Sequence, residues 1–191
     1  MLNIVIFGAP GSGKGTQSDK IIAEYGVEHI STGDVLRAEI KAGTEVGKKA
    51  AALINEGKLV PDSVIIDILA STLDAKGKNI KGVIFDGFPR TIAQAEALNA
   101  MLEERGESVS TVIGLEVDDE ELIKRIVARG ATSGRADDNA ETAKKRLETY
   151  YNQTLPLKDC YIKEGKYAMI EGVGAIDEIY ARIKKTIDDC L

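Results

Sequence analysis

A glycine-rich segment directly after the first apolar run constrains the possible folds of this chain more than any other feature. The apolar run is Leu2–Phe7, the segment is GAPGSGKGT at residues 8–16, and helical sequence begins at Gln17. Glycines let the backbone curl so that successive N–H groups point inward, and the following helix adds the positive end of its dipole. Together with the charge of Lys14, the order of strand, loop and helix predicts a polyphosphate-binding site.

The residue after Lys14 departs from the general phosphate-loop pattern, which has Ser or Thr there. Gly15 takes this position, and the hydroxyl comes only at Thr16. A direct magnesium ligand from the loop is therefore not assumed, and Mg²⁺ held mainly through water is the alternative. The other interpretation is a tight turn between strand and helix that binds no ligand. It is disfavoured because the segment matches the phosphate-loop pattern at most positions and lies between a strand and a helix, as that pattern requires.

Short apolar runs alternate with stretches of helical spacing along the chain. The runs are Leu2–Phe7, Val27–Ile30, Gly82–Asp86, Thr111–Val117 and Tyr167–Glu171. Nearly all of their residues are apolar, as in strands that are covered on both faces. This pattern predicts an α/β fold with a parallel sheet flanked by helices. The carboxyl ends of the strands should then share one edge of the sheet, where a ligand binds.

The segment Ser31–Val60 interrupts this alternation and is richer in charge and glycine than the strands. Its spacing predicts two helices, Asp34–Ala42 and Glu45–Glu56, which Gly43 and Gly57 should end. Neither helix has an apolar face large enough for a core of its own. We therefore expect a small mobile insert attached to the main domain.

A second interruption, Arg129–Asp138, has the sequence RGATSGRADD and predicts a short polar loop between two helices. Asp138 and Glu141 have the spacing of a capping box, which predicts that the next helix begins there. We expect the loop to be the second small mobile attachment of a single domain, with the core in residues 1–30, 61–128 and 139–191.

Charge and cysteine content argue against several classes of protein. The chain has 25 Lys and Arg against 31 Asp and Glu, a net charge of −6, which does not favour binding to nucleic acid or to anionic membranes. Cys160 and Cys190 lack the paired spacing of a zinc site and the density of a disulfide scaffold. Leu2–Phe7 is too short for a signal peptide or a membrane span. We expect a cytoplasmic protein that binds neither nucleic acid nor a membrane.

Four motifs together resemble the adenylate kinase family in its form with a short lid. They are GAPGSGKGTQ at residues 8–17, HISTGDVLR at 29–37, DGFPRT at 86–91 and RGATSGRADDN at 129–139. The resemblance covers essentially the whole chain, with the motifs in the same order. It implies reversible transfer of the γ-phosphoryl group of MgATP to AMP, giving two ADP, in adenine nucleotide homeostasis. It also implies a nucleoside monophosphate kinase fold with five parallel strands, a nucleotide-binding insert at 31–60 and a short lid at 129–138.

Arginine matches phosphate oxygens with a planar fork and keeps its charge when it is dehydrated. The chain has eight arginines, and for Arg105 and Arg182 we expect only a position on a solvated helix face. The resemblance assigns two arginines each to the AMP phosphate, to the ATP phosphates and to closure over the transferring group: Arg37 and Arg90, Arg125 and Arg129, Arg135 and Arg146. By position alone, Arg125, Arg129 and Arg146 could equally lie on solvated helix faces. The catalytic residues implied are Lys14, Arg90, Arg125, Arg129, Arg135 and Arg146.

The resemblance further implies two sets of nucleotide-binding residues. The ATP set is Gly11, Ser12, Gly13, Lys14, Gly15, Thr16, Arg129 and Gly174, and Gly172 is close enough to be the alternative to Gly174. The AMP set is Thr32, Arg37, Lys58, Leu59, Val60, Gly87, Phe88, Pro89, Arg90, Gln94, Arg135 and Arg146. Gln94 is the residue that would donate to and accept from the edge of adenine. The spacing Thr91-x-x-Gln94 also fits a helix capping box, which would occupy Gln94 with its own backbone.

Asp86 ends a buried strand and is the candidate that orients Mg²⁺ through water, although a strand-end Asp is often only a turn or cap residue. For His29, at the end of another strand, we expect a structural role. The lid has no cysteine between Arg129 and Arg135, so no zinc is expected there.

Three alternatives remain at this point. The nearest is a UMP/CMP kinase, with the same chemistry on another acceptor. The second is a switch GTPase, but its guanine-reading motif NKxD does not occur in the chain. The third is a nucleotide-binding module without turnover, which would leave the arginines unexplained. The ligands expected are ATP, AMP and ADP, and a monomer is expected because two moving inserts leave little fixed surface for a partner.

Overall fold

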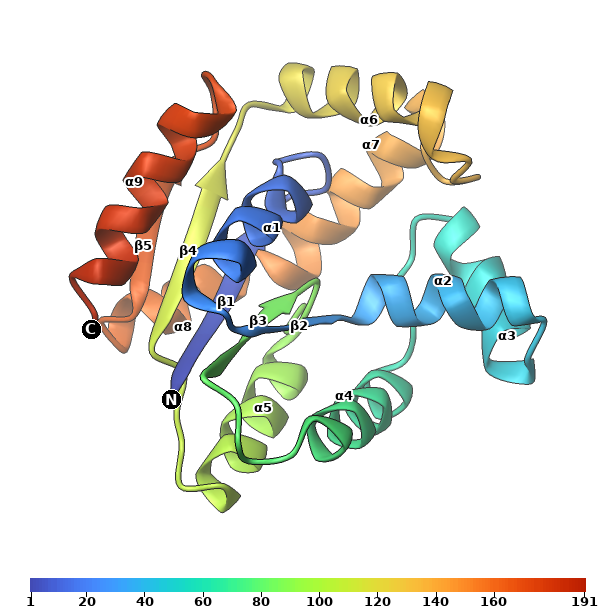
Figure 1. The fold of residues 1–191 in the computed structure, drawn as a ribbon. Helices are drawn as coiled ribbons and strands as arrows, with labels where there is room; N and C mark the ends of the chain where they lie inside the picture. Colours follow the sequence, from blue (N-terminus) through green and yellow to red (C-terminus); the bar gives the residue numbers. More distant parts are fainter.

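The first apolar run forms the central strand of a parallel sheet in the computed structural model, which describes residues 1–191 (Figure 1). The sheet has five strands in the order β2-β3-β1-β4-β5. Their bounds are β1 (Leu2–Gly8), β2 (Glu28–Ser31), β3 (Gly82–Asp86), β4 (Thr111–Glu116) and β5 (Tyr167–Glu171). All neighbouring strands run parallel, so the predicted fold class is confirmed.

Helices connect the strands and cover both faces of the sheet. They are α1 (Lys14–Tyr25), α2 (Thr32–Ala42), α3 (Glu45–Asn55), α4 (Asp62–Lys76), α5 (Ile92–Glu104), α6 (Asp119–Ser133), α7 (Ala140–Thr149), α8 (Pro156–Lys163) and α9 (Ile176–Asp188). A five-residue π-helical turn, η1 (Tyr150–Thr154), lies between α7 and α8. None of these helices is both long and apolar enough to cross a membrane.

The alternation of side chains along β1 separates two buried clusters, one on each face of the sheet. Val5 and Phe7 pack with residues of α4, α5 and α8, whereas Ile4 and Ile6 pack with residues of α1 and α9. A strand that is buried on both faces is apolar at nearly every position and does not alternate apolar with polar residues. This is why β1 appears in the sequence as a continuous apolar run.

The two helices expected in the segment 31–60 are present as α2 and α3. Ser31 caps α2, and its side chain accepts from the backbone N–H of Asp34, so the helix begins two residues earlier than predicted. Gly43 ends α2 in the left-handed region, with φ of 68°. Leu36 and Ala50 join the buried cluster that contains Val5, so the two helices share the core of the main domain.

The expectation of a polar loop over 129–138 is wrong for its first half. Helix α6 continues to Ser133, and the chain leaves the helix at Gly134, with φ of 66°. The predicted capping box at Asp138 is also wrong: Asn139 caps α7, and its side chain accepts from the N–H of Thr142 at 2.9 Å. The carboxylate of Asp138 has other partners, which are described below.

Candidate active site

The glycine-rich loop between β1 and α1 wraps around the side chain of Lys14. Gly11 and Gly13 have φ of 82° and 96°, and a Cβ on Gly11 would come within 2.9 Å of the carbonyl oxygen of Leu122. Lys14 is the first residue of α1, and its Nζ donates to the carbonyls of Gly8 and Ala9 at 2.8 and 3.0 Å. Burial lowers its pKa to about 7, against the opposing effect of Asp86.

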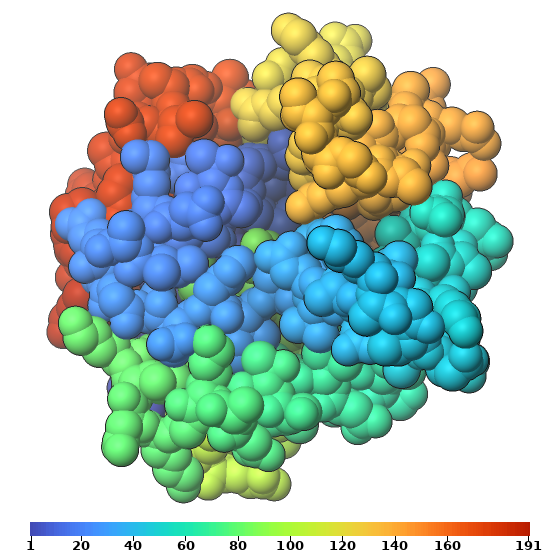
Figure 2. All heavy atoms as spheres, turned by 45° about the vertical axis from the view of Figure 1, so that its right-hand side comes forward, coloured from blue at the N-terminus to red at the C-terminus, as the bar shows by residue number.

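A cleft with about 1030 Å³ of empty space, part of it open to solvent, extends from this loop to α2, α3, α5 and α7. Figure 2 shows a hollow between the blue N-terminal segment and the yellow and orange segment that includes α6 and α7. Every residue expected to contact AMP lines this cleft except Arg135. Of the residues expected to contact ATP, only Lys14 does so. Several polar and aromatic residues that line the cleft were not predicted from the sequence: Asp137, Thr149, Tyr150 and Thr154.

Arg90 is held at three points by the structure around it. Its Nε donates to the carbonyl of Gly87, its backbone N–H donates to Oε1 of Gln94, and its carbonyl accepts from Oγ1 of Thr154, each at 2.8 Å. Burial lowers the pKa of Arg90, and Asp86 opposes this effect. Thr154 is the last residue of η1, so the π-helical turn has a direct contact with the arginine loop.

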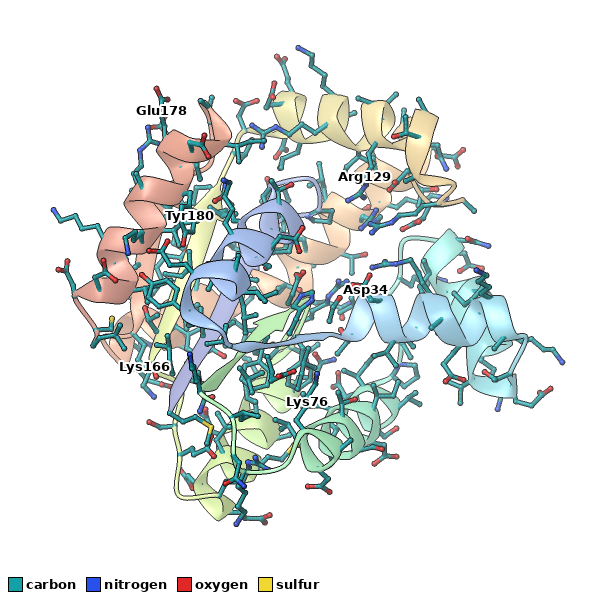
Figure 3. The ribbon with its side chains drawn as sticks, viewed as in Figure 1. Asp34, Lys76, Arg129, Lys166, Glu178 and Tyr180 are labelled. Atoms are coloured by element: carbon teal, nitrogen blue, oxygen red, sulfur yellow. The ribbon has the colours of Figure 1, made fainter.

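Two adjacent acids between α6 and α7, Asp137 and Asp138, hold the arginines of these two helices. Both oxygens of Asp138 accept from Arg129, at 2.8 and 2.6 Å, and Oδ2 also accepts from Ser133 at 2.8 Å. Nη1 of Arg146 lies 3.1 Å from Asp137 and 3.4 Å from Asp138. Figure 3 shows Arg129 on the side of α6 that faces α2, where Asp34 is labelled. A pair of acids beside arginines was a signal for this contact, whereas the spacing of Asp138 and Glu141 predicted a helix cap.

Arg37 and Arg135 are less enclosed than Arg90. Arg37 forms an ion pair with Asp34 on the same helix. Arg135 lies outside the residues that line the cleft, and partial burial lowers its pKa, as do Arg37 and Arg129. The charges of Arg37 and Arg129 therefore act on Arg135, and a group of like cationic charges attracts anions.

Asp86, at the end of β3, has His29 of β2 as its partner, with Nε2 and Oδ2 separated by 3.5 Å. Burial would raise the pKa of Asp86, but the contact with His29 and the charges of Lys14 and Arg90 outweigh it, so the pKa lies below its ordinary value. The same contact raises the pKa of His29. The carboxylate therefore stays ionised beside Lys14, at the edge of the sheet where the loop begins.

Arg125 connects the glycine-rich loop with the segment after β5. Its Nη2 donates to the carbonyl of Gly172 at 3.0 Å, and its Nε donates to Glu121 at 2.9 Å. A Cβ on Gly172 would lie 3.5 Å from the carbonyl oxygen of Ser12, whereas Gly174 has Glu178 as its neighbour. Of the two glycines, Gly172 is therefore the one next to the loop.

Arg105 and Arg182 lie away from the cleft. The expectation of a solvated face is wrong for Arg105, because its side chain is only 10% exposed, pairs with Glu107 and donates to the carbonyl of Gly77. Arg182 is exposed, and its guanidinium donates to the carbonyl of Glu171 at 2.9 Å.

Comparison with known proteins agrees with this arrangement. Residues 6–166 match the family model described as adenylate kinase. The chain is 61% identical over 189 residues to the adenylate kinase of Parabacteroides distasonis, with 99% of both chains covered. It is 63% identical over 188 residues to that of Phocaeicola vulgatus, with 98% of this chain and 99% of the relative covered. The adenylate kinase of Maricaulis maris is 46% identical, with 98% of this chain and 100% of the relative covered.

Proposed function

The chain belongs to the adenylate kinase family and transfers the γ-phosphoryl group of MgATP to AMP to give two ADP; from this premise we propose which of its residues do the work. The observation that carries the proposal is that Lys14, Arg37, Arg90 and Arg146 line one cleft together with Gln94. Phosphoryl transfer needs two oxygens held in line and compensation of the charge spread over the moving group. Cationic side chains around one cleft provide both.

The phosphates of ATP bind in the loop of residues 8–16 and along α6. Backbone N–H groups of Gly11 and Gly13 in the loop and of Gly15 in the first turn of α1 suit an anion, and Lys14 adds a full charge. Arg125 and Arg129 approach from α6, and Asp138 orients Arg129 by accepting two hydrogen bonds from it. The remaining members of the ATP set are Ser12, Thr16 and Gly174.

AMP binds at the other end of the cleft, between α2, α3 and α5. Arg37 and Arg90 bind its phosphate, and Gln94 reads the edge of the adenine. The backbone and apolar atoms of residues 58–60 and 87–89, together with Thr32, enclose the nucleoside. Arg146 already lines the cleft, and Arg135 reaches the AMP side when the 129–138 segment closes over the cleft and excludes water, which would otherwise attack ATP.

Magnesium enters with ATP, and Asp86 is the residue that would orient it. A single carboxylate at the edge of the sheet suits Mg²⁺, which usually keeps several water ligands and one or two carboxylates. Mg²⁺ held there would supply positive charge that compensates the phosphates. The lid offers zinc no cysteine ligands. We further propose a cytoplasmic monomer, because both cysteines are free and the 31–60 and 129–138 segments need room to move.

Two measurements test these assignments. With MgATP as donor, ADP formation should depend on AMP and should be much slower with CMP or UMP; comparable rates with CMP would favour the pyrimidine alternative. Arg90→Ala should lower turnover by about 10²- to 10³-fold, as the loss of one preorganised charge contact does. Lys163→Ala removes an exposed cation at the end of α8, outside the residues that line the cleft, and should leave turnover unchanged. A near-normal rate for Arg90→Ala would contradict the assignment.

A further inference from the structure

Asp62, the first residue of α4, has contacts that the nucleotide-binding roles above do not explain. Its Oδ1 accepts from Nε2 of Gln94 at 2.9 Å and from Oγ1 of Thr91 at 3.0 Å. Gln94 is only 1% exposed, yet it lines the cleft. Asp62 therefore touches the back of the side chain that is proposed to meet the base of AMP.

The amide of Gln94 is held at both of its ends. Its Nε2 donates to Asp62, and its Oε1 accepts from the backbone N–H of Arg90 at 2.8 Å. An ionised carboxylate only accepts, and a backbone N–H only donates. Rotating the amide by 180° would place oxygen against oxygen and N–H against N–H, so two hydrogen bonds would become two repulsive contacts. One orientation of the amide is thereby selected.

A primary amide has two N–H donors and two acceptor positions on its oxygen. The protein uses one of each, so Gln94 keeps one donor and one acceptor for a ligand. The edge of adenine offers an acceptor at N1 and a donor at its 6-amino group, which match this pair. Hypoxanthine, the base of IMP, offers an acceptor at O6 and a donor at N1–H, which is the inverted order. Only a rotated amide could pair with it.

We propose that Asp62 is a specificity-determining positioning residue, which selects AMP over 6-oxopurine nucleotides by fixing the orientation of the Gln94 amide. The inference rests on the proposed role of Gln94 as the reader of adenine. Sites whose buried polar groups are fully committed reject the wrong ligand strongly, because a bound mismatch leaves those groups unpaired. Cytosine has the donor and acceptor order of adenine, so the orientation of Gln94 that Asp62 selects does not discriminate against CMP.

The test compares AMP, IMP and CMP as acceptors in an assay of ADP formation from MgATP. In Asp62→Asn the side chain can either accept from or donate to Gln94, and the hydroxyl of Thr91 can adapt to both, so only Arg90 still opposes rotation of the amide. The ratio of kcat/KM for AMP over IMP should fall about 10- to 100-fold, the effect of one charge-assisted hydrogen bond. The ratio for AMP over CMP should change little.

Controls separate this inference from the one it rests on. Asp67→Asn makes the same charge change at an exposed position of α4 and should leave the AMP/IMP ratio unchanged. Gln94→Ala should lower the ratio; if it does not, the proposed reading of adenine by Gln94 is wrong. If Gln94→Ala lowers the ratio and Asp62→Asn leaves it at the wild-type value, the role of Asp62 alone is refuted. Asp62→Ala, checked for folding by circular dichroism, decides the outcome if the Asn variant does not fold.

Discussion

Replacing Thr154 with valine tests whether the π-helical turn holds the arginine loop in place. Valine has nearly the same shape as threonine, so the substitution removes one hydroxyl and leaves the packing intact. Oγ1 of Thr154 donates to the carbonyl of Arg90 at 2.8 Å, and Thr154 is 6% exposed. An acceptor left buried without a partner costs about 1–3 kcal/mol, and removal of the polar hydroxyl offsets part of that cost. We expect a net loss of about 1–2 kcal/mol in the free energy of unfolding.

For a domain of this size, 1 kcal/mol corresponds to roughly 2–4 °C, so Tm should fall by about 2–8 °C. The same change should loosen Arg90, because only the contacts with Gly87 and Gln94 would still hold it. We therefore expect a lower kcat and a higher KM for AMP, with the KM for ATP nearly unchanged. Thermal unfolding and steady-state kinetics with each substrate varied in turn measure both effects.

Two further variants make this experiment decisive. Thr154→Ser keeps the hydroxyl and should retain most of the activity. Thr72→Val removes a hydroxyl that donates to the carbonyl of Ile68 at 2.7 Å, four residues earlier in the same helix, where the helix itself still supplies a donor. If Thr154→Val unfolds and turns over like Thr72→Val, the reasoning about Arg90 is refuted.

Two predictions concern charge. Because burial lowers the pKa of Lys14 to about 7, against 10.5 in the unfolded chain, the unfolded state binds more protons between these values, and the free energy of unfolding should rise with pH there. Lys14→Met should lack that rise in urea unfolding measured at a series of pH values; identical profiles would contradict the pKa. Asp138→Asn should cost about 1–3 kcal/mol of stability at pH 7, since Asp138 is fully buried but its partner Arg129 is 35% exposed and partly screened. Burial would raise the pKa of Asp138, yet hydrogen bonds from Arg129 and Ser133 lower it below the value in the unfolded chain. The stability that the carboxylate contributes is therefore fully present above the unfolded pKa, and it is lost as the pH falls through the lower pKa of the folded state. The free energies of unfolding of the wild type and of Asp138→Asn should therefore converge at acid pH. A difference that persists there would mean that the charge of Asp138 is not what stabilises the protein.

Two predictions from the sequence, for Asp138 and for Arg105, were wrong for the same physical reason. Asp138 and Glu141 match a capping box, but Asn139 caps the helix because the carboxylate of Asp138 pairs with Arg129, nine residues earlier. Arg105 has the local sequence of a surface arginine, yet its guanidinium donates a hydrogen bond to the carbonyl of Gly77. In each case a partner distant in sequence outweighed the local preference, and local spacing holds no information about such partners.

The sequence by itself determined the parts that depend on neighbouring residues: the buried strands, the glycine-rich loop around Lys14, the family and the reaction. Apolar runs favour buried strands and glycines favour tight turns because of local sterics and burial, so both can be read from the order of residues in the sequence. Only the tertiary structure decided how the polar groups pair, such as Asp62 with Gln94 and Thr154 with Arg90, which are 32 and 64 residues apart. A hydrogen bond requires its two atoms within about 3 Å, and only the packing of whole helices on the sheet sets such distances across the chain.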